Sequence, residues 1–110
     1  MANDICEGVL RPQGDLAGVF EYDGETSYFY LYEPDDPKGI GIKGHIHVTS
    51  RRPDFAAHDV AITWNRTASM VGLRIRGQLW AVLSAAGDKY GGDYKPRGAP
   101  SIPASVLATF

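Results

Sequence analysis

The chain has 110 residues, of which 44% are hydrophobic and 22% charged, which is typical of one folded domain over residues 1–110 and not of a disordered segment. Its net charge of −2 weighs against strong nucleic-acid affinity, and its single cysteine, Cys6, excludes an internal disulfide and favours a reducing compartment. The acidic N-terminal segment does not resemble a signal peptide, and no apolar run approaches the roughly 18 residues of a membrane span, so we expect a cytoplasmic protein without membrane association.

The charges are distributed unevenly along the chain. Residues 1–50 contain nine acidic and three basic residues, a net charge of −6. Residues 51–110 contain eight basic and four acidic residues, a net charge of +4. The two halves either lie side by side and neutralise each other, or present a charged face that steers a partner of opposite sign.

The first predicted hairpin covers residues 16–33 and turns at Asp23-Gly24, a frequent turn dipeptide. A three-residue loop would pair Phe20 with Tyr28, whereas a two-residue loop would shift this register by one residue. The sequence leaves both registers open.

A half-buried strand is expected over residues 40–49, after a loop over residues 33–39 that contains two prolines and a glycine. Its apolar and polar residues alternate, so each set should share one face. The expected inward residues are Ile40, Ile42, Ile46 and Val48, and the expected outward residues are Lys43, His45, His47 and Thr49.

The second half begins with a loop or single turn over residues 51–58. Alternating patterns then predict strands over residues 59–64 and 69–75, with their apolar residues on one face. After a tight turn, residues 78–86 are apolar on both faces, which is typical of a central strand that is covered on both sides.

The last 24 residues contain a loop and a helix. Residues 87–100 are rich in glycine and proline and predict a long loop. Residues 101–110 have near-helical spacing, with Ser101 as the expected N-cap and Pro103 in the first turn. The whole pattern predicts an all-β fold: a β-sandwich or small barrel of about six to eight mainly antiparallel strands with one short C-terminal helix.

Three tyrosines alternate along the second strand of the first hairpin. Tyr28, Tyr30 and Tyr32 would share one face, while Phe29 and Leu31 would take the core face. The tyrosines either pack under another layer, line a small-molecule groove, or form a recognition face of large, stiff side chains with polar tips. Three acidic residues follow the tyrosines in the sequence: Glu33, Asp35 and Asp36.

His45 and His47 lie two residues apart on a predicted strand, so both would point the same way and could bind a metal through two imidazoles. With Gly39 they resemble the first half of the cupin metal motif, but Arg51 and Arg52 stand where that motif has a glutamate. The metal hypothesis requires the pair to face a cavity. The simpler alternative is an exposed polar strand face.

Other patterns carry weaker signals. His58-Asp59 could be a base with its orienting carboxylate only outside a strand, and the serines lie in no nucleophile elbow. The glycine-rich residues 89–98 lack the Gly-Lys-Ser/Thr ending of a phosphate loop. A basic patch for single-stranded nucleic acid would combine arginines with a stacking Trp80 or Tyr90. Its arginines would be Arg51, Arg52, Arg74 and Arg76.

The segments "HIHV", "HDVAITWN" and "MVGLRIRGQLWAVLS" lie between residues 45 and 84. Together they resemble a bacterial family of small β-rich proteins catalogued as a domain of unknown function. The resemblance implies a small β-rich bacterial protein and carries over no catalytic residue. In size and acidity, such proteins are similar to immunity proteins, which neutralise toxins of neighbouring bacteria.

The leading hypothesis is a cytoplasmic protein-binding module, such as a toxin-neutralising immunity protein that docks a basic toxin domain. The expected docking residues are Tyr28, Tyr30, Tyr32, Glu33, Asp35 and Asp36. We expect no enzymatic activity, no cofactor and no nucleic-acid partner, and a homodimer is left open. The alternative is a small-molecule or metal-binding β-barrel, with or without enzymatic activity, that uses His45 and His47.

Overall fold

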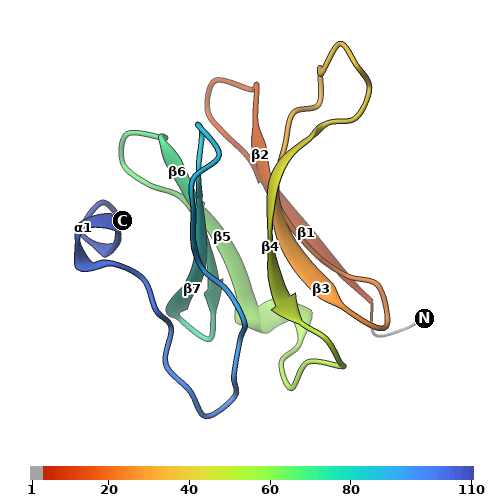
Figure 1. The fold of residues 1–110 in the computed structure, drawn as a ribbon, viewed down its shortest axis with the longest axis vertical. Coiled ribbons are helices and arrows are strands. Elements are labelled where there is room, and N and C mark those ends of the chain that lie inside the picture. Colours follow the sequence, from red (N-terminus) through yellow and green to blue (C-terminus); the bar gives the residue numbers. More distant parts are fainter. Residues whose placement is uncertain (1–3) are drawn as a thin grey trace.

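The computed structural model describes residues 4–110. Residues 1–3, the start of the N-terminal segment that does not resemble a signal peptide, lie outside this range. Residues 4–110 form two four-stranded antiparallel sheets (Figure 1). The first sheet has the order β1 (Ile5–Leu10), β2 (Ala17–Tyr22), β3 (Ser27–Tyr32) and β4 (Ile42–Thr49). The second has the order β5 (Val60–Trp64), β6 (Met70–Ile75), β7 (Gln78–Ser84) and β8 (Lys89–Gly91).

The hydrophobic core lies between the two sheets. Phe20, Phe29 and Leu31 of the first sheet are fully buried in one cluster with Leu73 and Leu83 of the second. Because the strands hydrogen-bond into two separate sheets, the fold is a sandwich and not a closed barrel. The predicted all-β sandwich is confirmed.

The outer faces of the two sheets differ in how much of their surface other segments cover. On the second sheet, Leu79 and Val82 pack under the C-terminal segment in one cluster with Ile102, Val106 and Phe110. This segment contains the short helix α1 (Ala104–Leu107), which lies beside the second sheet in Figure 1. Strand β7 is therefore central and covered on both faces, as predicted. On the outer face of the first sheet, by contrast, Tyr28 and Tyr32 remain 38% and 37% exposed.

The turn between β2 and β3 selects one of the two registers that the sequence left open. Phe20 pairs with Phe29, which is the register of the two-residue loop. The Asp23 amide donates to the Thr26 carbonyl, and the Asp23 carboxylate accepts hydrogen bonds from the amides of Glu25 and Thr26. These bonds lower the pKa of the Asp23 carboxyl, that from the Thr26 amide most strongly.

Strand β4 departs from simple alternation at both ends. Near its start, a register shift leaves Lys43 as an extra residue and places Ile42 opposite the outward-facing Tyr32. Ile42 is consequently 49% exposed, and Ile40 is exposed as well. The prediction that Ile40 and Ile42 face the core is wrong, because a bulge reverses the side-chain alternation.

A second register shift turns Thr49 inward, opposite Ser27, although the sequence predicted an outward side chain. Both residues are buried, and their hydroxyl oxygens lie 2.7 Å apart. The Ser27 hydroxyl also accepts the Thr49 amide at 3.1 Å. The polar pair therefore satisfies itself inside the core.

Two further details differ from the sequence-based expectations. The predicted loop over residues 87–100 contains the edge strand β8, which pairs with β7. The N-cap of α1 is Pro103 and not Ser101. As a separate finding, no helix within residues 4–110 is long and apolar enough to cross a membrane. Residues Ala57–Asp59 form the 3₁₀ turn η1, which fits the predicted single turn.

The close approach of the sheets at Gly18 gives a stability prediction. A Cβ at Gly18 would lie 2.5 Å from Val71 Cγ2 and 3.2 Å from Ile62 Cγ2, whereas at Gly8 the nearest atoms would be 3.5 Å away. Gly18→Ala should therefore lower the free energy of unfolding by about 1–3 kcal/mol through overpacking. Gly8→Ala, the matched control, should change it by less than about 0.5 kcal/mol. Urea unfolding measures both, and equal stability of the two variants would contradict the close sheet contact.

Candidate functional site

The outer face of the first sheet is formed largely by aromatic side chains. Because Phe29 and Leu31 enter the core, Tyr28, Tyr30 and Tyr32 point outward from β3, as the alternation predicted. Tyr28 and Tyr32 are 38% and 37% exposed. We call the following residues the tyrosine face: Glu21, Tyr28, Tyr30, Tyr32, Ile42 and His45.

A shallow hollow of about 290 Å³ lies on this face. Two residues of the β2–β3 turn, Asp23 and Thr26, line the hollow. The rest of the lining belongs to the tyrosine face: Glu21, Tyr28, Tyr30, Ile42 and His45. The lining is more apolar than polar, with a carboxylate at Glu21, so a partner's apolar side chain with a cationic end would fit it. Sequence reasoning missed Ile42 because the bulge was not foreseen, and missed Glu21 because the hairpin register was open.

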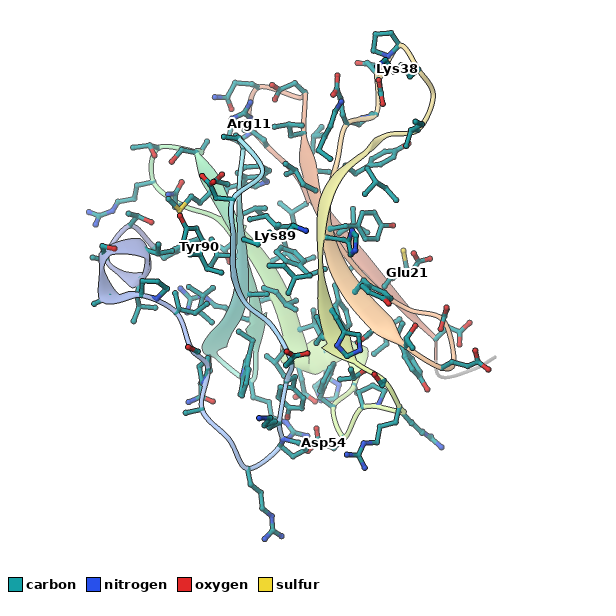
Figure 2. The ribbon with its side chains drawn as sticks, in the orientation of Figure 1. Arg11, Glu21, Lys38, Asp54, Lys89 and Tyr90 are labelled. Carbon is teal, nitrogen blue, oxygen red and sulfur yellow. The ribbon has the colours of Figure 1, made fainter. Side chains whose placement is uncertain are left out.

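Tyr30 and Glu21 form the polar contact within this hollow. The Tyr30 hydroxyl donates to Glu21 Oε1 at 3.2 Å. Burial of the half-buried phenol, reinforced by the Glu21 charge and this hydrogen bond, raises the pKa of Tyr30 to about 12. Figure 2 shows Glu21 on the side of the first sheet that faces away from the second.

The three acidic residues after the tyrosines play different roles. The Glu33 carboxylate pairs with Lys43 at 2.9 Å. The Asp36 side chain is only 8% exposed and accepts the amides of Gly41 and Lys38, which lower the pKa of its carboxyl. Asp36 therefore holds the protruding loop whose tip carries Lys38 (Figure 2), whereas Asp35 is exposed and makes no ion pair within residues 4–110.

The histidine pair lies on the outside of the sheet. His45 and His47 flank Tyr28, with ring centroids 5.7 and 5.5 Å from its ring. The metal hypothesis required an inward-facing pair, and this requirement is not met. Both ring nitrogens of His47 already have partners, Asp93 and Ser50. No group of three or more potential metal-binding residues occurs within the described part of the chain.

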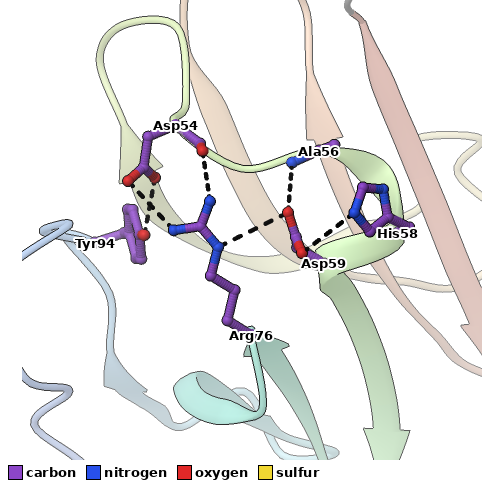
Figure 3. A network of polar contacts seen from close by, with 6 residues as sticks. All are labelled: Asp54, Ala56, His58, Asp59, Arg76 and Tyr94. Atoms are coloured by element: carbon purple, nitrogen blue, oxygen red, sulfur yellow. Dashed lines mark hydrogen bonds and ion pairs between the residues drawn. The ribbon is translucent and has the colours of Figure 1, made fainter.

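The His58-Asp59 pair belongs to a cluster at one end of the sandwich (Figure 3). His58 Nε2 lies 3.5 Å from Asp59 Oδ1 on the η1 turn, so the pair has the non-strand geometry that the sequence required. Asp59 also accepts the Ala56 amide at 2.9 Å and lies 3.8 Å from Arg76 Nε. The carboxylate therefore caps the turn and fixes an arginine.

The same arginine binds the neighbouring loop. Arg76 donates to the Asp54 carbonyl at 2.6 Å, and the Tyr94 hydroxyl donates to the Asp54 carboxylate at 2.9 Å (Figure 3). Burial and this bond raise the pKa of the Tyr94 phenol. Arg76 thus joins three segments and is not free for phosphate. Trp80 is only 3% exposed, so it cannot stack on a base, and this part of the nucleic-acid hypothesis is wrong.

Comparison with models of known protein families, with characterised proteins and with solved structures finds no match. The resemblance of residues 45–84 to a bacterial family of unknown function therefore stays a prediction.

The raised pKa of Tyr30 has a measurable consequence. The ordinary value is 10.0 and the folded value about 12, so the fold favours the neutral phenol. This contribution to stability is complete below pH 10 and is lost as the pH rises towards 12. An NMR titration of the Tyr30 ring, assigned with a Tyr30→Phe variant, should give a midpoint well above 10.0.

Glu21→Gln separates the two causes of this shift. The midpoint of Tyr30 should fall in this variant, because the charge of Glu21 is removed. It should still stay above 10.0, because burial is the larger cause. A wild-type midpoint at 10.0 would contradict the burial of the phenol.

Proposed function

We propose that this protein is a protein-binding module that docks a partner on the tyrosine face. The observation that carries the proposal is the difference between the two sheets. The second sheet is covered on its outer face by Ile102, Val106 and Phe110, whereas Tyr28 and Tyr32 on the first remain 38% and 37% exposed. Exposed tyrosines that lie together on a rigid sheet supply contact area with little loss of side-chain entropy on binding.

The charges around the tyrosine face favour a basic partner. Glu21 lies on the face, Asp23 and Glu25 lie in the turn at one end, and Asp35 is exposed in the loop at the other end. The nearby cation Lys43 is paired with Glu33. A partner with lysine or arginine side chains around an apolar centre would complement this arrangement.

The specific form of this proposal is a toxin-neutralising protein of a bacterium whose partner is a basic toxin domain. It rests on the small size of the chain, the acidity of residues 1–50 and the resemblance described above. In this form the acidic rim attracts the toxin, and the tyrosines supply the apolar contact that holds it.

The partner should be captured by a light-activated cross-linker at the position of Ile42, at the edge of the hollow. The same cross-linker at Thr63, an exposed position of β5 on the second sheet, is the matched control. The proposal requires a cross-linked product at Ile42 that is absent at Thr63, with a partner peptide that contains lysine or arginine. Products of equal yield at both positions, or none at Ile42, would refute it.

Association kinetics with the captured partner test the charge argument. Asp35→Lys combined with Glu25→Lys should slow association about tenfold at low salt, and added salt should reduce the difference. These two positions avoid Glu33 and Asp36, whose carboxylates hold the 33–41 loop. Tyr32→Ala should instead speed dissociation, since the tyrosine contributes contact and no charge. An unchanged association rate in the charge variant would exclude a basic partner surface.

A further inference from the structure

Beyond the tyrosine face, the structure brings a serine, a histidine and an aspartate into one hydrogen-bonded chain. Ser50 Oγ lies 2.7 Å from His47 Nε2, and Asp93 Oδ1 lies 3.0 Å from His47 Nδ1. Serine hydrolases use this order, with serine and carboxylate on opposite ring nitrogens, and the constellation is recognised by geometry and not by sequence position. In the sequence the serines lie in no nucleophile elbow, and no residue pattern links positions 50 and 93.

The main chain fixes this arrangement from two sides. His47 lies near the end of β4, and Ser50 follows in the bend after it. Asp93 follows β8, where its amide donates to the His47 carbonyl at 2.9 Å. The next amide, of Tyr94, donates to the Val48 carbonyl at 2.9 Å. The two backbone bonds place the Asp93 carboxylate beside the imidazole, so the alignment does not depend on side-chain contacts alone.

Gly92 permits this approach of the two segments. Its φ is +107°, and a Cβ there would lie 3.0 Å from the His47 carbonyl oxygen and 2.5 Å from Ile46 Cγ2. Any larger residue would be strained and would push the segment away from β4. The glycine is therefore part of what positions Asp93.

The orientation of the imidazole follows from its partners. The Asp93 carboxylate can only accept a hydrogen bond, so the neutral ring carries its proton on Nδ1. Nε2 then holds a lone pair that faces the Ser50 hydroxyl. This is the tautomer that a general base needs in order to take the proton of a serine.

We propose that Ser50 is a nucleophile for acyl transfer, with His47 as general base and Asp93 as the residue that orients it. This activity is independent of the docking function proposed above. Ser50 Oγ attacks the carbonyl carbon of an ester while its proton passes to His47 Nε2. The ester C–O bond then breaks, and His47 returns the proton to the leaving alkoxide. Water, activated by His47, hydrolyses the acyl-serine and regenerates the hydroxyl.

The surroundings of Ser50 indicate an anionic ester as the substrate. Ser50, His47 and Asp93 line a surface hollow of about 600 Å³ together with Arg51, Arg52 and Lys95. Within residues 4–110, no ion pair engages these three cations. The other acid in the lining, Asp54, is held by Arg76 and Tyr94. The hollow therefore offers positive charge to a carboxylate on the substrate.

A donor for the negative charge that develops on the attacked carbonyl oxygen is also at hand. In hydrolases, the amide of the residue after the nucleophile commonly has this role. Here that residue is Arg51, and within residues 4–110 its amide donates to no acceptor. Electrostatic stabilisation of this kind is usually the largest single contribution to acyl transfer.

The deciding experiment is covalent labelling with a fluorophosphonate, a reagent for activated serines. In this reaction the serine Oγ bonds to phosphorus, the P–F bond breaks with loss of fluoride, and the serine proton passes to the base. Peptide mass spectrometry should locate one label on Ser50. Labelling should disappear in Ser50→Ala and fall about 10²–10⁴-fold in rate in Asp93→Asn, which favours the wrong tautomer. Ser101→Ala, an exposed serine outside the hollow, should label at the wild-type rate.

Ester hydrolysis tests the substrate class. The mono-para-nitrophenyl ester of adipic acid, which is anionic, should be cleaved with a higher kcat/KM than neutral para-nitrophenyl acetate. Lys95→Ala should lower kcat/KM for the anionic ester about tenfold, as expected for one lost charge-assisted hydrogen bond, and change that for acetate much less. Equal kcat/KM for both esters, or an equal loss for both in Lys95→Ala, would overturn the anionic preference.

The label on Ser50 is the criterion, because any exposed histidine can hydrolyse activated esters slowly. No label at a large excess of reagent, or label spread over several serines, would overturn the proposal. The Ser50–His47–Asp93 chain would then serve only to fasten the segment after β8 to β4. Circular dichroism and urea unfolding of each variant show that a lost label does not reflect an unfolded chain.

Discussion

Burial of Phe29 and Leu31 is the constraint on which the exposed surface of this protein depends. Successive side chains of a strand point to opposite faces, so a β3 that anchors the core with these two residues must present its three tyrosines outward. On the second sheet, the C-terminal segment covers the outer face. The uncovered aromatic surface is therefore a direct result of how the core is filled.

The sequence predicted the features that follow from local periodicity. The alternation of β3, the burial of β7 on both faces and the short C-terminal helix could be derived from the spacing of apolar residues. The bulge at Lys43 could not, because a single extra residue leaves the composition of the strand unchanged while it reverses the direction of Ile42. The same holds for Thr49, which reads as a polar outward residue until its partner Ser27 is known.

The sequence also did not predict which distant segments contact each other. Asp93 lies in a stretch whose glycines and prolines predicted only a loop, and nothing local indicates that it approaches His47. Arg76 is exposed, as expected, but the sequence did not predict that it joins the 54–59 region to the β6–β7 turn. The candidate docking surface was therefore foreseen in large part, whereas the Ser50–His47–Asp93 chain was not, because it depends wholly on tertiary structure.

The backbone hydrogen bonds from Asp93 and Tyr94 to β4 also affect self-association of the protein. An edge strand with free carbonyl groups is a template for strand addition, the first step of many aggregation and domain-swapping events. Here the His47 and Val48 carbonyls are already occupied by amides of the same chain. Gly92, which lets the segment after β8 lie close to β4, thus also protects this stretch of the sheet edge from pairing with a strand of another molecule.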